Sequence, residues 1–270
     1  MRLADAIGLR IGGKDAIEAR LNGQVVWSPP VSDQLQSVLD LLYPAGEEGV
    51  FRLYQQTALG QQLLYRDSSA TTATTNASDP IGYARDLSGN DNHGIQTVSS
   101  ARPTAFPGIF DGVDDHLVSA GGFGAGDFAM CFAIDAARLT NDSVIASNYD
   151  GSSSGFILYG STPLGSANGN IRLWTGVDLE LIVGPDLRGS GKKVISVSRL
   201  GSTYTLRIDG VQIGQAAGST ASLLRPTLFL GRRGGTSPNC ISADFIADAF
   251  FDNATLEKVE TVESYFATLL

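Results

Sequence analysis

Two short polar segments of the sequence contain the residue types that metal binding and acid–base catalysis require. The first segment, "RDLSGNDNHGIQ" at positions 85–96, contains Asp86, Asn90, Asp91, Asn92 and His93. The second segment, "FDGVDDHL" at positions 110–117, contains Asp111, Asp114, Asp115 and His116. Carboxylates and amide oxygens are suitable ligands for a hard cation such as Ca²⁺. A carboxylate beside a histidine is suitable for acid–base catalysis.

The first polar segment is also typical of a tight turn. Asp, Asn, Ser and Gly hydrogen-bond their own backbone and tolerate left-handed conformations, which accounts for nearly all of its residues. The segment lacks the alternating ligands and the distal glutamate of an EF-hand loop. We therefore predict a tight loop, and the alternative is a calcium site formed by Asp86, Asn90, Asp91 and Asn92.

The second polar segment is expected to form a strand, with a bulge or a close approach of a neighbouring segment at Gly112. Its apolar side chains would be buried, namely Phe110, Val113, Leu117 and Val118. Its polar side chains would lie on the exposed side, namely Asp114, Asp115 and His116. Adjacent residues of a strand point to opposite faces. Asp114 and Asp115 alone therefore cannot flank a glycosidic bond as hydrolysis requires.

Sugar binding requires an aromatic ring against the sugar face and planar polar side chains that hydrogen-bond to hydroxyls. The candidates in expected loops and turns are Asn148, Tyr149, Asp150, Arg232, Arg233 and Asp115. Trp174 and Arg172 form a further pair on an expected strand, where we favour core packing for the tryptophan. The Walker, HExxH and CxxC motifs of other common catalysts are absent from the sequence.

Composition limits the class of protein. The chain has 270 residues, of which 43% are hydrophobic, so it can form a sizeable core, and its 32 Gly and 10 Pro favour short strands joined by turns. Its net charge is −9 and it has no Lys/Arg run, which argues against nucleic-acid binding. No apolar run reaches the roughly 18 residues of a membrane span. The N-terminal residues also lack the apolar core of a secretion signal.

The two cysteines, Cys131 and Cys240, are too few for a zinc quartet or a disulfide framework. We expect both to be thiols, and a single bridge between them is the alternative.

The second half of the chain predicts an antiparallel β-sandwich. Short apolar or alternating runs recur there with Gly, Ser, Asn and Asp between them and no intervening helix. The expected strands are 128–135, 143–147, 155–160, 170–176, 179–184, 193–199, 203–210, 211–215, 227–232 and 243–251. A terminal helix follows, because apolar residues recur at helical spacing, namely Leu256, Val259, Val262, Tyr265 and Phe266.

The first part of the chain is expected to contain a small β-module and a connecting segment. Residues 1–30 alternate apolar and polar positions, and Asn22-Gly23 predicts a hairpin in a three-stranded module. Residues 31–82 are expected to hold one helix, capped by Ser32 or Asp33, and irregular structure that packs on the sandwich. The apolar face of this helix would be formed by Leu35, Val38, Leu39 and Leu42.

The run "ISVSRLGSTYTLRIDGVQIG" resembles a strand–turn–strand element of concanavalin A-like lectin/glucanase sandwiches of the laminin-G-like type. "TLFLGRR" and "FIADAFFDNATLEKVETVESYFA" resemble the final strands and helix of these domains, and both polar segments resemble their opening. The resemblance covers roughly residues 83–270 and implies an all-β jelly roll. Glucanases of this fold have Glu-x-Asp-x-x-Glu on one strand, whereas "DLELIV" offers only Asp178 and Glu180. We therefore expect that the protein is not an enzyme.

The string "YPAGEEGVFRLY" together with "LLYRDSSATTATTNASDPIGYARDLSGNDNHGIQ" resembles a segment that recurs in tailed-phage and prophage virion proteins. "LRIGGKDAIEARLNGQVVWSPP" is similar to short β-modules at the start of phage tail and fibre proteins. These resemblances imply a virion appendage that is assembled in the bacterial cytoplasm, in which residues 1–30 bind other virion proteins. A homo-oligomer, with a trimer favoured, is expected by analogy.

The expected function is adhesion, in which the sandwich binds polysaccharide on the host cell surface. Repetition in an oligomer would strengthen weak glycan contacts through avidity. Two alternatives remain open. The protein is either a structural decoration or tail component that binds only virion proteins, or a polysaccharide depolymerase.

Overall fold

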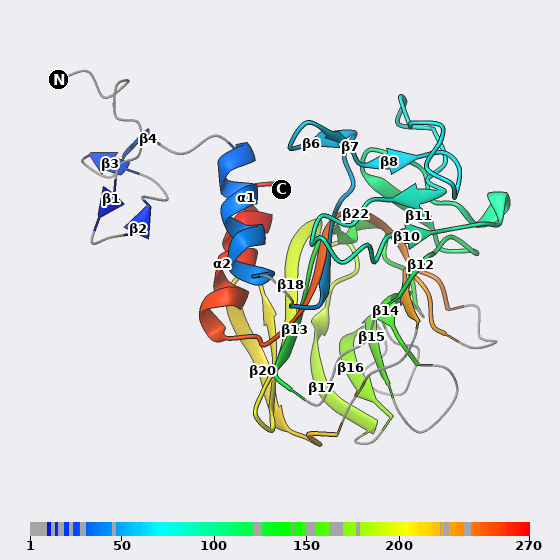
Figure 1. The fold of residues 1–270 in the computed structure, drawn as a ribbon. Helices are drawn as coiled ribbons and strands as arrows, with labels where there is room; N and C mark the ends of the chain where they lie inside the picture. Colours follow the sequence, from blue (N-terminus) through cyan, green and yellow to red (C-terminus); the bar gives the residue numbers. More distant parts are fainter. Residues whose placement is uncertain are drawn as a thin grey trace.

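The structure is a computed structural model in which two antiparallel β-sheets stack face to face and two helices cover one of them (Figure 1). It describes residues 10–11, 14–15, 19–21, 24–27, 31–44, 47–120, 126–141, 143–149, 155–161, 170–176, 179–221, 223, 227–234 and 239–270. The predicted fold class, an all-β concanavalin A-like antiparallel sandwich with a C-terminal helix, is confirmed.

The first sheet has seven strands, in the order β11-β22-β13-β18-β19-β20, and β5 pairs with the second half of β22. Their bounds are β5 (Gly49–Leu53), β11 (Gly108–Asp111), β13 (Phe128–Asp135), β18 (Lys192–Leu200), β19 (Thr203–Ile208), β20 (Val211–Ala217) and β22 (Ser242–Asp252). Helix α2 packs on β13 and β18 on the side away from the other sheet (Figure 1). Because both faces are covered, β13 is an almost uninterrupted apolar run, "FAMCFAID".

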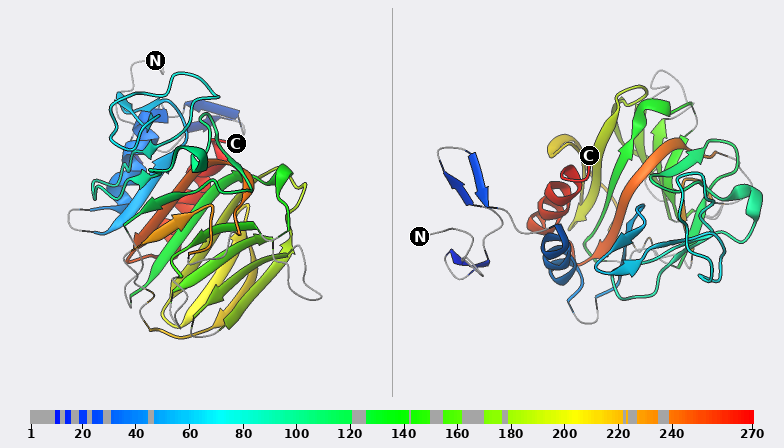
Figure 2. Two further views of the ribbon diagram at one scale, coloured as in Figure 1. Left: turned by 90° about the vertical axis from the view of Figure 1, so that its right-hand side faces the viewer. Right: turned by 90° about the horizontal axis from the view of Figure 1, so that it is seen from above.

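The second sheet has nine strands, in the order β17-β16-β15-β14-β21-β12-β10-β9-β8. Their bounds are β8 (Leu64–Tyr65), β9 (Tyr83–Ala84), β10 (Gly94–Ile95), β12 (Leu117–Ser119), β14 (Ser143–Ser147), β15 (Phe156–Ser161), β16 (Asn170–Thr175), β17 (Leu179–Asp186) and β21 (Leu228–Leu230). One face packs on the first sheet and the other is the outer face, seen in Figure 2 (left). In β21, for example, Leu228 and Leu230 are in the core and Phe229 is half-buried on the outer face.

Two helices complete the sandwich, α1 (Val31–Leu42) and α2 (Leu256–Ala267). The predicted apolar face of α1 is confirmed, but this helix begins at Val31, so Ser32 and Asp33 lie in its first turn instead of preceding it. In α2 the Thr255 side chain accepts the Lys258 N–H as N-cap. Of the five apolar residues predicted to pack in α2, Leu256 is the exception, because it is 49% exposed.

The segment that precedes residue 83 contributes directly to both sheets. Besides β5 and β8 it contains a small hairpin of β6 (Thr57–Ala58) and β7 (Gln61–Gln62). Its irregular part is held by two carboxylates: Asp67 accepts the N–H groups of Ser69, Thr71 and Thr72, and Asp79 accepts those of Thr75 and Asn76. Burial opposes the charge of Asp67, but these hydrogen bonds outweigh it and hold the pKa of the carboxyl well below its usual range.

The described N-terminal residues form two separate hairpins instead of the expected three-stranded module. One pairs β1 (Arg10–Ile11) with β2 (Lys14–Asp15), and the other pairs β3 (Ala19–Leu21) with β4 (Gln24–Trp27). Leu21 pairs with Gln24 in the second hairpin, and the turn predicted at Asn22-Gly23 lies outside the described residues.

A buried polar network lies inside the sandwich. The Arg52 guanidinium donates to the Asp248 carboxylate through Nε and Nη2, with Nη2 2.7 Å from Oδ2. Its Nη1 also donates to Ser119 Oγ. Tyr54 Oη donates to the same carboxylate over 2.8 Å. Arg52 and Asp248 are 1% and 0% exposed. The two charges can be buried only because they pair with each other and their remaining polar atoms form hydrogen bonds. The network connects β5 and β22 of one sheet to β12 of the other.

Cys131 and Cys240 are both buried thiols, as expected, and do not form a disulfide. Burial raises the pKa of both, that of Cys240 to about 11. In the part of the chain that the structure describes, neither helix is long and apolar enough to span a membrane.

Candidate functional site

The first polar segment is a loop that fastens the end of β9 to β5. Both Asp86 carboxylate oxygens are occupied, because they accept the N–H groups of Phe51, Ser88 and Asn92 and the Ser88 hydroxyl. The side-chain amides of Asn90 and Asn92 donate to the backbone carbonyl of Gly49. The loop prediction is therefore confirmed. The polar atoms of these side chains are used to hold the backbone, and the calcium alternative at Asp86, Asn90, Asp91 and Asn92 gains no support from them.

His93 closes this loop from its far end. Its Nδ1 accepts the Asp86 N–H over 3.0 Å, and its Nε2 lies 3.4 Å from an oxygen of Asp91. Burial lowers the pKa of His93, although the carboxylates of Asp86 and Asp91 oppose that shift. The imidazole ring also packs on Tyr83, with centroids 4.7 Å apart.

The second polar segment is not the single strand that was expected. β11 ends at Asp111 in the seven-stranded sheet and β12 begins at Leu117 in the nine-stranded sheet, so the residues between them turn from one sheet to the other. Gly112 has φ +82°, a left-handed conformation that suits glycine, and Val113 is 69% exposed instead of buried. Asp115 and His116, which were expected on an exposed side, are 6% and 9% exposed.

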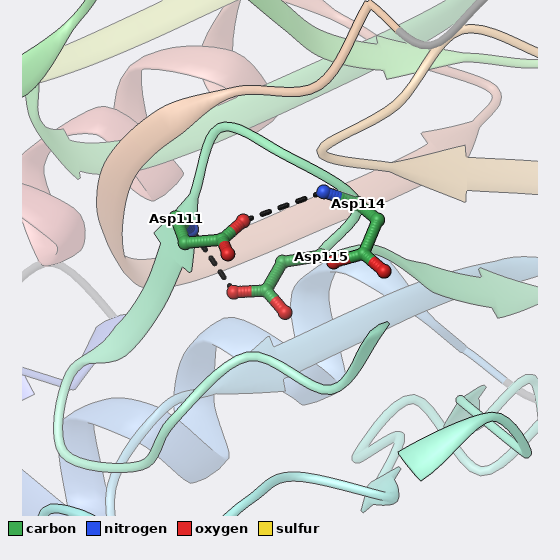
Figure 3. A group of neighbouring side chains, drawn as sticks. All are labelled: Asp111, Asp114 and Asp115. Carbon is green, nitrogen blue, oxygen red and sulfur yellow. Dashed lines mark hydrogen bonds between the residues drawn. The ribbon is translucent and has the colours of Figure 1, made fainter. Parts of the chain in front are cut away.

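The turn gathers the three carboxylates of Asp111, Asp114 and Asp115 within 4.8 Å of one another (Figure 3). Asp111 Oδ1 accepts the N–H groups of Val113 and Asp114, and Asp115 Oδ2 accepts the Asp111 N–H over 2.9 Å. Burial raises the pKa of Asp115 to about 6, and the charges of its two acidic neighbours add to this shift. Among the described residues this is where carboxylates that could hold a cation come together, and it is not the segment that the sequence suggested.

His116 connects this turn to Arg232. Its Nδ1 lies 2.7 Å from the Asp114 carbonyl oxygen, the Gln96 amide contacts its ring, and Arg232 Nη1 lies 3.4 Å from its Nε2. Burial lowers the pKa of His116. Arg232 therefore faces the acidic turn, whereas its neighbour Arg233 faces a different group of residues.

The loop after β14 is anchored by Asn148. This residue is 1% exposed, its amide donates to the Leu223 carbonyl over 2.6 Å, and its Oδ1 accepts the Phe156 N–H over 2.7 Å. Its burial therefore gives Asn148 a structural role instead of the sugar contact suggested by its place in the loop. Asp150, the third candidate of this loop, lies outside the described residues.

Tyr149, Trp174 and Arg233 form an aromatic–arginine cluster on the outer face of the nine-stranded sheet. The rings of Tyr149 and Trp174 meet edge to face with centroids 4.8 Å apart, and Arg233 Cζ lies 5.2 Å from the Tyr149 centroid. Trp174 is half-buried, and its strand neighbour Leu173 points into the core. The core packing favoured for Trp174 is therefore wrong, because its place in the alternation of β16 puts it on the outer face.

Strand register extends this cluster into a continuous row of side chains across eight strands, here called the outer-face row. Cross-strand partners project from the same face of a sheet. From β8 to β16 the row consists of Tyr65, Tyr83, Ile95, Val118, Phe229, Ser147, Ile157 and Trp174. Six of its members are half-buried, whereas Ser147 and Ile157 are buried.

A separate open cleft of about 570 Å³ lies at one end of the seven-stranded sheet, near the C-terminus. Its floor includes the cross-strand neighbours Asp244, Asp135 and Lys192. Their polar groups are already engaged, because Asp244 pairs with Arg138 and Asp135 accepts the Ala137 N–H. The aromatic residues that line this cleft are Tyr54 and Phe106.

Comparison with known proteins identifies the fold and relates it to enzymes that act on carbohydrates. No protein-family model and no curated protein sequence matches this chain. Among solved structures it is similar to a GH54 α-L-arabinofuranosidase soaked with a cyclic sulfate inhibitor, at TM-score 0.61 and 12% identity, covering 89% of this chain and 65% of that one. It is also similar to an arabinofuranosidase complexed with arabinofuranosyl-α-1,2-xylobiose, at TM-score 0.61 and 13% identity. The alignment covers 88% of this chain and 65% of the arabinofuranosidase chain.

A more distant similarity is to a sialidase of Trypanosoma rangeli in complex with 2,3-difluorosialic acid, at TM-score 0.51 and 12% identity. This chain aligns over 88% of its own length but over only 38% of the sialidase chain. The expectation that the protein is not an enzyme is contradicted by these findings, because the structures with a similar fold are glycoside hydrolases. At these identities the similarity establishes the fold, and any activity of this chain is a matter for proposal.

Proposed function

We propose that this chain recognises a glycan through the outer face of its nine-stranded sheet, with Tyr149, Trp174 and Arg233 as the primary contacts. The observation that supports the proposal most strongly is the edge-to-face pair of Tyr149 and Trp174 beside an arginine. A sugar face can stack on the flat apolar surface of an indole or phenol ring. A planar guanidinium can donate two parallel hydrogen bonds to hydroxyl or carboxylate oxygens.

The surroundings of the cluster favour a binding role. It lies on the face of the sheet that neither the other sheet nor a helix covers (Figure 2, left). Asn148 is held by hydrogen bonds to Leu223 and Phe156, and the neighbouring Tyr149 N–H donates to Ser147 Oγ, so the ring is positioned before a ligand arrives, which lowers the entropic cost of binding. The fold is similar to that of enzymes whose ligands are carbohydrates.

The glycan proposed is a polysaccharide of the bacterial cell surface, and the protein is proposed to be part of a phage-type virion. This part of the proposal depends on the sequence resemblance of residues 9–30 and of segments between 43 and 96 to virion proteins. The attachment role of residues 1–30 and a trimeric state belong to it and stay predictions. Deleting residues 1–30 should prevent incorporation into particles, and unchanged incorporation would contradict this part of the proposal.

Affinity electrophoresis in gels that contain different polysaccharides tests the binding proposal. Trp174→Ala and Tyr149→Ala should abolish retardation in the gel that retards the wild-type protein, whereas Trp174→Phe should retain part of it. Val211→Ala is a matched control, because Val211 is 61% exposed on β20 of the other sheet. Retardation that survives both alanine variants would exclude this face as the binding site.

Cleavage of the glycan is a second candidate function, and the acidic turn favours it. Burial raises the pKa of Asp115 to about 6, a property of the general acid in glycoside hydrolysis, and the carboxylates of Asp111 and Asp114 lie within 4.8 Å. The turn leads directly into β12, whose Val118 belongs to the outer-face row. Release of reducing ends that ceases in Asp115→Asn would support cleavage at this turn. Release that continues unchanged in the variant would exclude it.

A further inference from the structure

A second aromatic cluster lies at the opposite end of the outer-face row, on β8 and β9. Tyr65 and Tyr83 meet edge to face with centroids 5.5 Å apart, and His93 packs on Tyr83. Arg85 Cζ lies 6.0 Å from the Tyr65 centroid, and its Nη2 donates to the Tyr65 hydroxyl over 3.3 Å. This cluster repeats the composition of the first one: two rings at a right angle and an arginine stacked on one of them.

The two clusters lie on the same face and in the same row. Tyr83 and Trp174 are separated by six strand-to-strand steps in the order β9-β10-β12-β21-β14-β15-β16. At about 4.8 Å per step this separation is roughly 29 Å. Between them, Ile95, Val118 and Phe229 are half-buried, so the row presents apolar surface from the second cluster as far as Phe229, whereas Ser147 and Ile157, next to Trp174, are buried beneath neighbouring residues.

Each cluster contains one arginine, and the second also lies beside the exposed carboxylate of Asp91, which is 3.4 Å from His93 Nε2. Within the described residues, no carboxylate forms an ion pair with Arg85 or Arg233. The chain as a whole has a net charge of −9, so two stacked arginines at the ends of one row differ from the rest of the molecule. A guanidinium fork matches a carboxylate or sulfate group in geometry as well as in charge.

We propose that the outer-face row binds a linear acidic polysaccharide that crosses the strands and contacts both clusters at once. This inference rests on the proposed function and extends it, because it assigns a second contact region and the chemical class of the ligand. Arg233 and Arg85 would each bind an anionic group of the chain, while the rings of Trp174 and Tyr83 stack on sugar faces. A ligand too short to reach both clusters would gain only one set of contacts.

Paired polysaccharides test the charge requirement. The probes are polygalacturonate, alginate, hyaluronan and polysialic acid, each compared with a counterpart whose carboxyl groups have been reduced to alcohols. At least one acidic probe should bind more than about tenfold more tightly than its reduced counterpart, and Arg85→Gln should weaken that binding and its dependence on salt. Equal binding of the acidic and reduced forms, or binding of the reduced forms alone, would overturn the proposal. In either case the proposed glycan function would remain intact.

A length series of the best acidic probe, from disaccharide to decasaccharide, tests whether both clusters are used. Tyr83→Ala should weaken binding of the longest oligomers about tenfold and leave the disaccharide unaffected, whereas Trp174→Ala should weaken both. Tyr83→Phe is the matched control and should retain binding. If Tyr83→Ala has no effect at any length while Trp174→Ala abolishes binding, the extended site is wrong and the primary site stands. If no polysaccharide of either kind binds, both proposals fail.

Discussion

The two sheets of the sandwich differ in how many of their faces are covered. The seven-stranded sheet is enclosed by α2 on one side and by the other sheet on the opposite side, and β13 is accordingly buried along nearly its whole length. The outer face of the nine-stranded sheet is covered by neither the other sheet nor α1 or α2, and it bears two aromatic–arginine clusters. The difference indicates that stability is concentrated between the sheets, and the outer face is where we propose that recognition takes place.

The largest expected effect comes from the buried network between the sheets. Asp248→Ala leaves the Arg52 guanidinium buried without its carboxylate and should lower the free energy of unfolding by about 3–5 kcal/mol. Chemical denaturation measures this loss. The double variant Arg52→Met with Asp248→Leu removes both charges and should be clearly more stable than the single variant. A single variant within about 1 kcal/mol of wild type would contradict the assignment of stability to this network.

A smaller, pH-dependent effect is expected at the acidic turn. The pKa of Asp115 in the folded protein is raised to about 6 from 3.8, so its stabilising contribution is complete below pH 3.8 and is lost as the pH rises through about 6. Asp115→Asn does not ionise and keeps an oxygen to accept the Asp111 N–H. The variant should therefore exceed wild type by about 3 kcal/mol at pH 8, with the difference becoming small near pH 4. Unfolding curves that differ by the same amount at every pH would contradict this.

The cap of α2 provides a third test on the enclosed side. Thr255→Ala removes the acceptor for the Lys258 N–H and should cost about 1 kcal/mol of stability. Glycan binding should be unchanged, because α2 packs on the seven-stranded sheet. Thr255→Ser is the control, since its hydroxyl can accept the same N–H. A loss of glycan affinity in a variant that remains fully folded would show that the two sides are not separate.

The smallest effect on stability is expected on the outer face itself. Trp174→Ala should change the free energy of unfolding by less than about 1 kcal/mol, because the ring is only half-buried and lies outside the core between the sheets. The same change should abolish glycan binding. Denaturation and binding measurements on one preparation check both statements. A large destabilisation would mean that Trp174 has a core role after all.

Local sequence patterns predicted the strands of the second half well, because alternation and compact apolar runs report directly on burial. β13 and β14 begin and end where the sequence predicted. The segment from Phe110 to Leu117 was misread as one strand, because its apolar spacing fits a strand as well as it fits two strand ends joined by a turn. Asp111 and Gly112 argued for a turn, because Asp hydrogen-bonds nearby backbone and Gly adopts left-handed conformations. The same residue types correctly predicted the loop at 86–93.

The candidate site was only partly predictable. Tyr149 and Arg233 were identified from their turn-rich surroundings, but Tyr65, Tyr83 and Phe229 were missed. These residues come from strands far apart in the sequence, and only the pairing order of the sheet brings them into one row. Asn148 and Asp115 were misjudged because the sequence does not show whether a polar side chain is used by its own fold.

Hydrogen–deuterium exchange with and without a bound acidic polysaccharide tests the central claim most directly. Binding at the outer face should slow exchange of backbone amides in β14, β15, β16 and β21 and in the loop at Tyr149, with further protection at β9 when the ligand is long. The seven-stranded sheet, including the cleft at Asp135 and Asp244, should be unaffected. Protection confined to that cleft, with none on the outer face, would contradict the account.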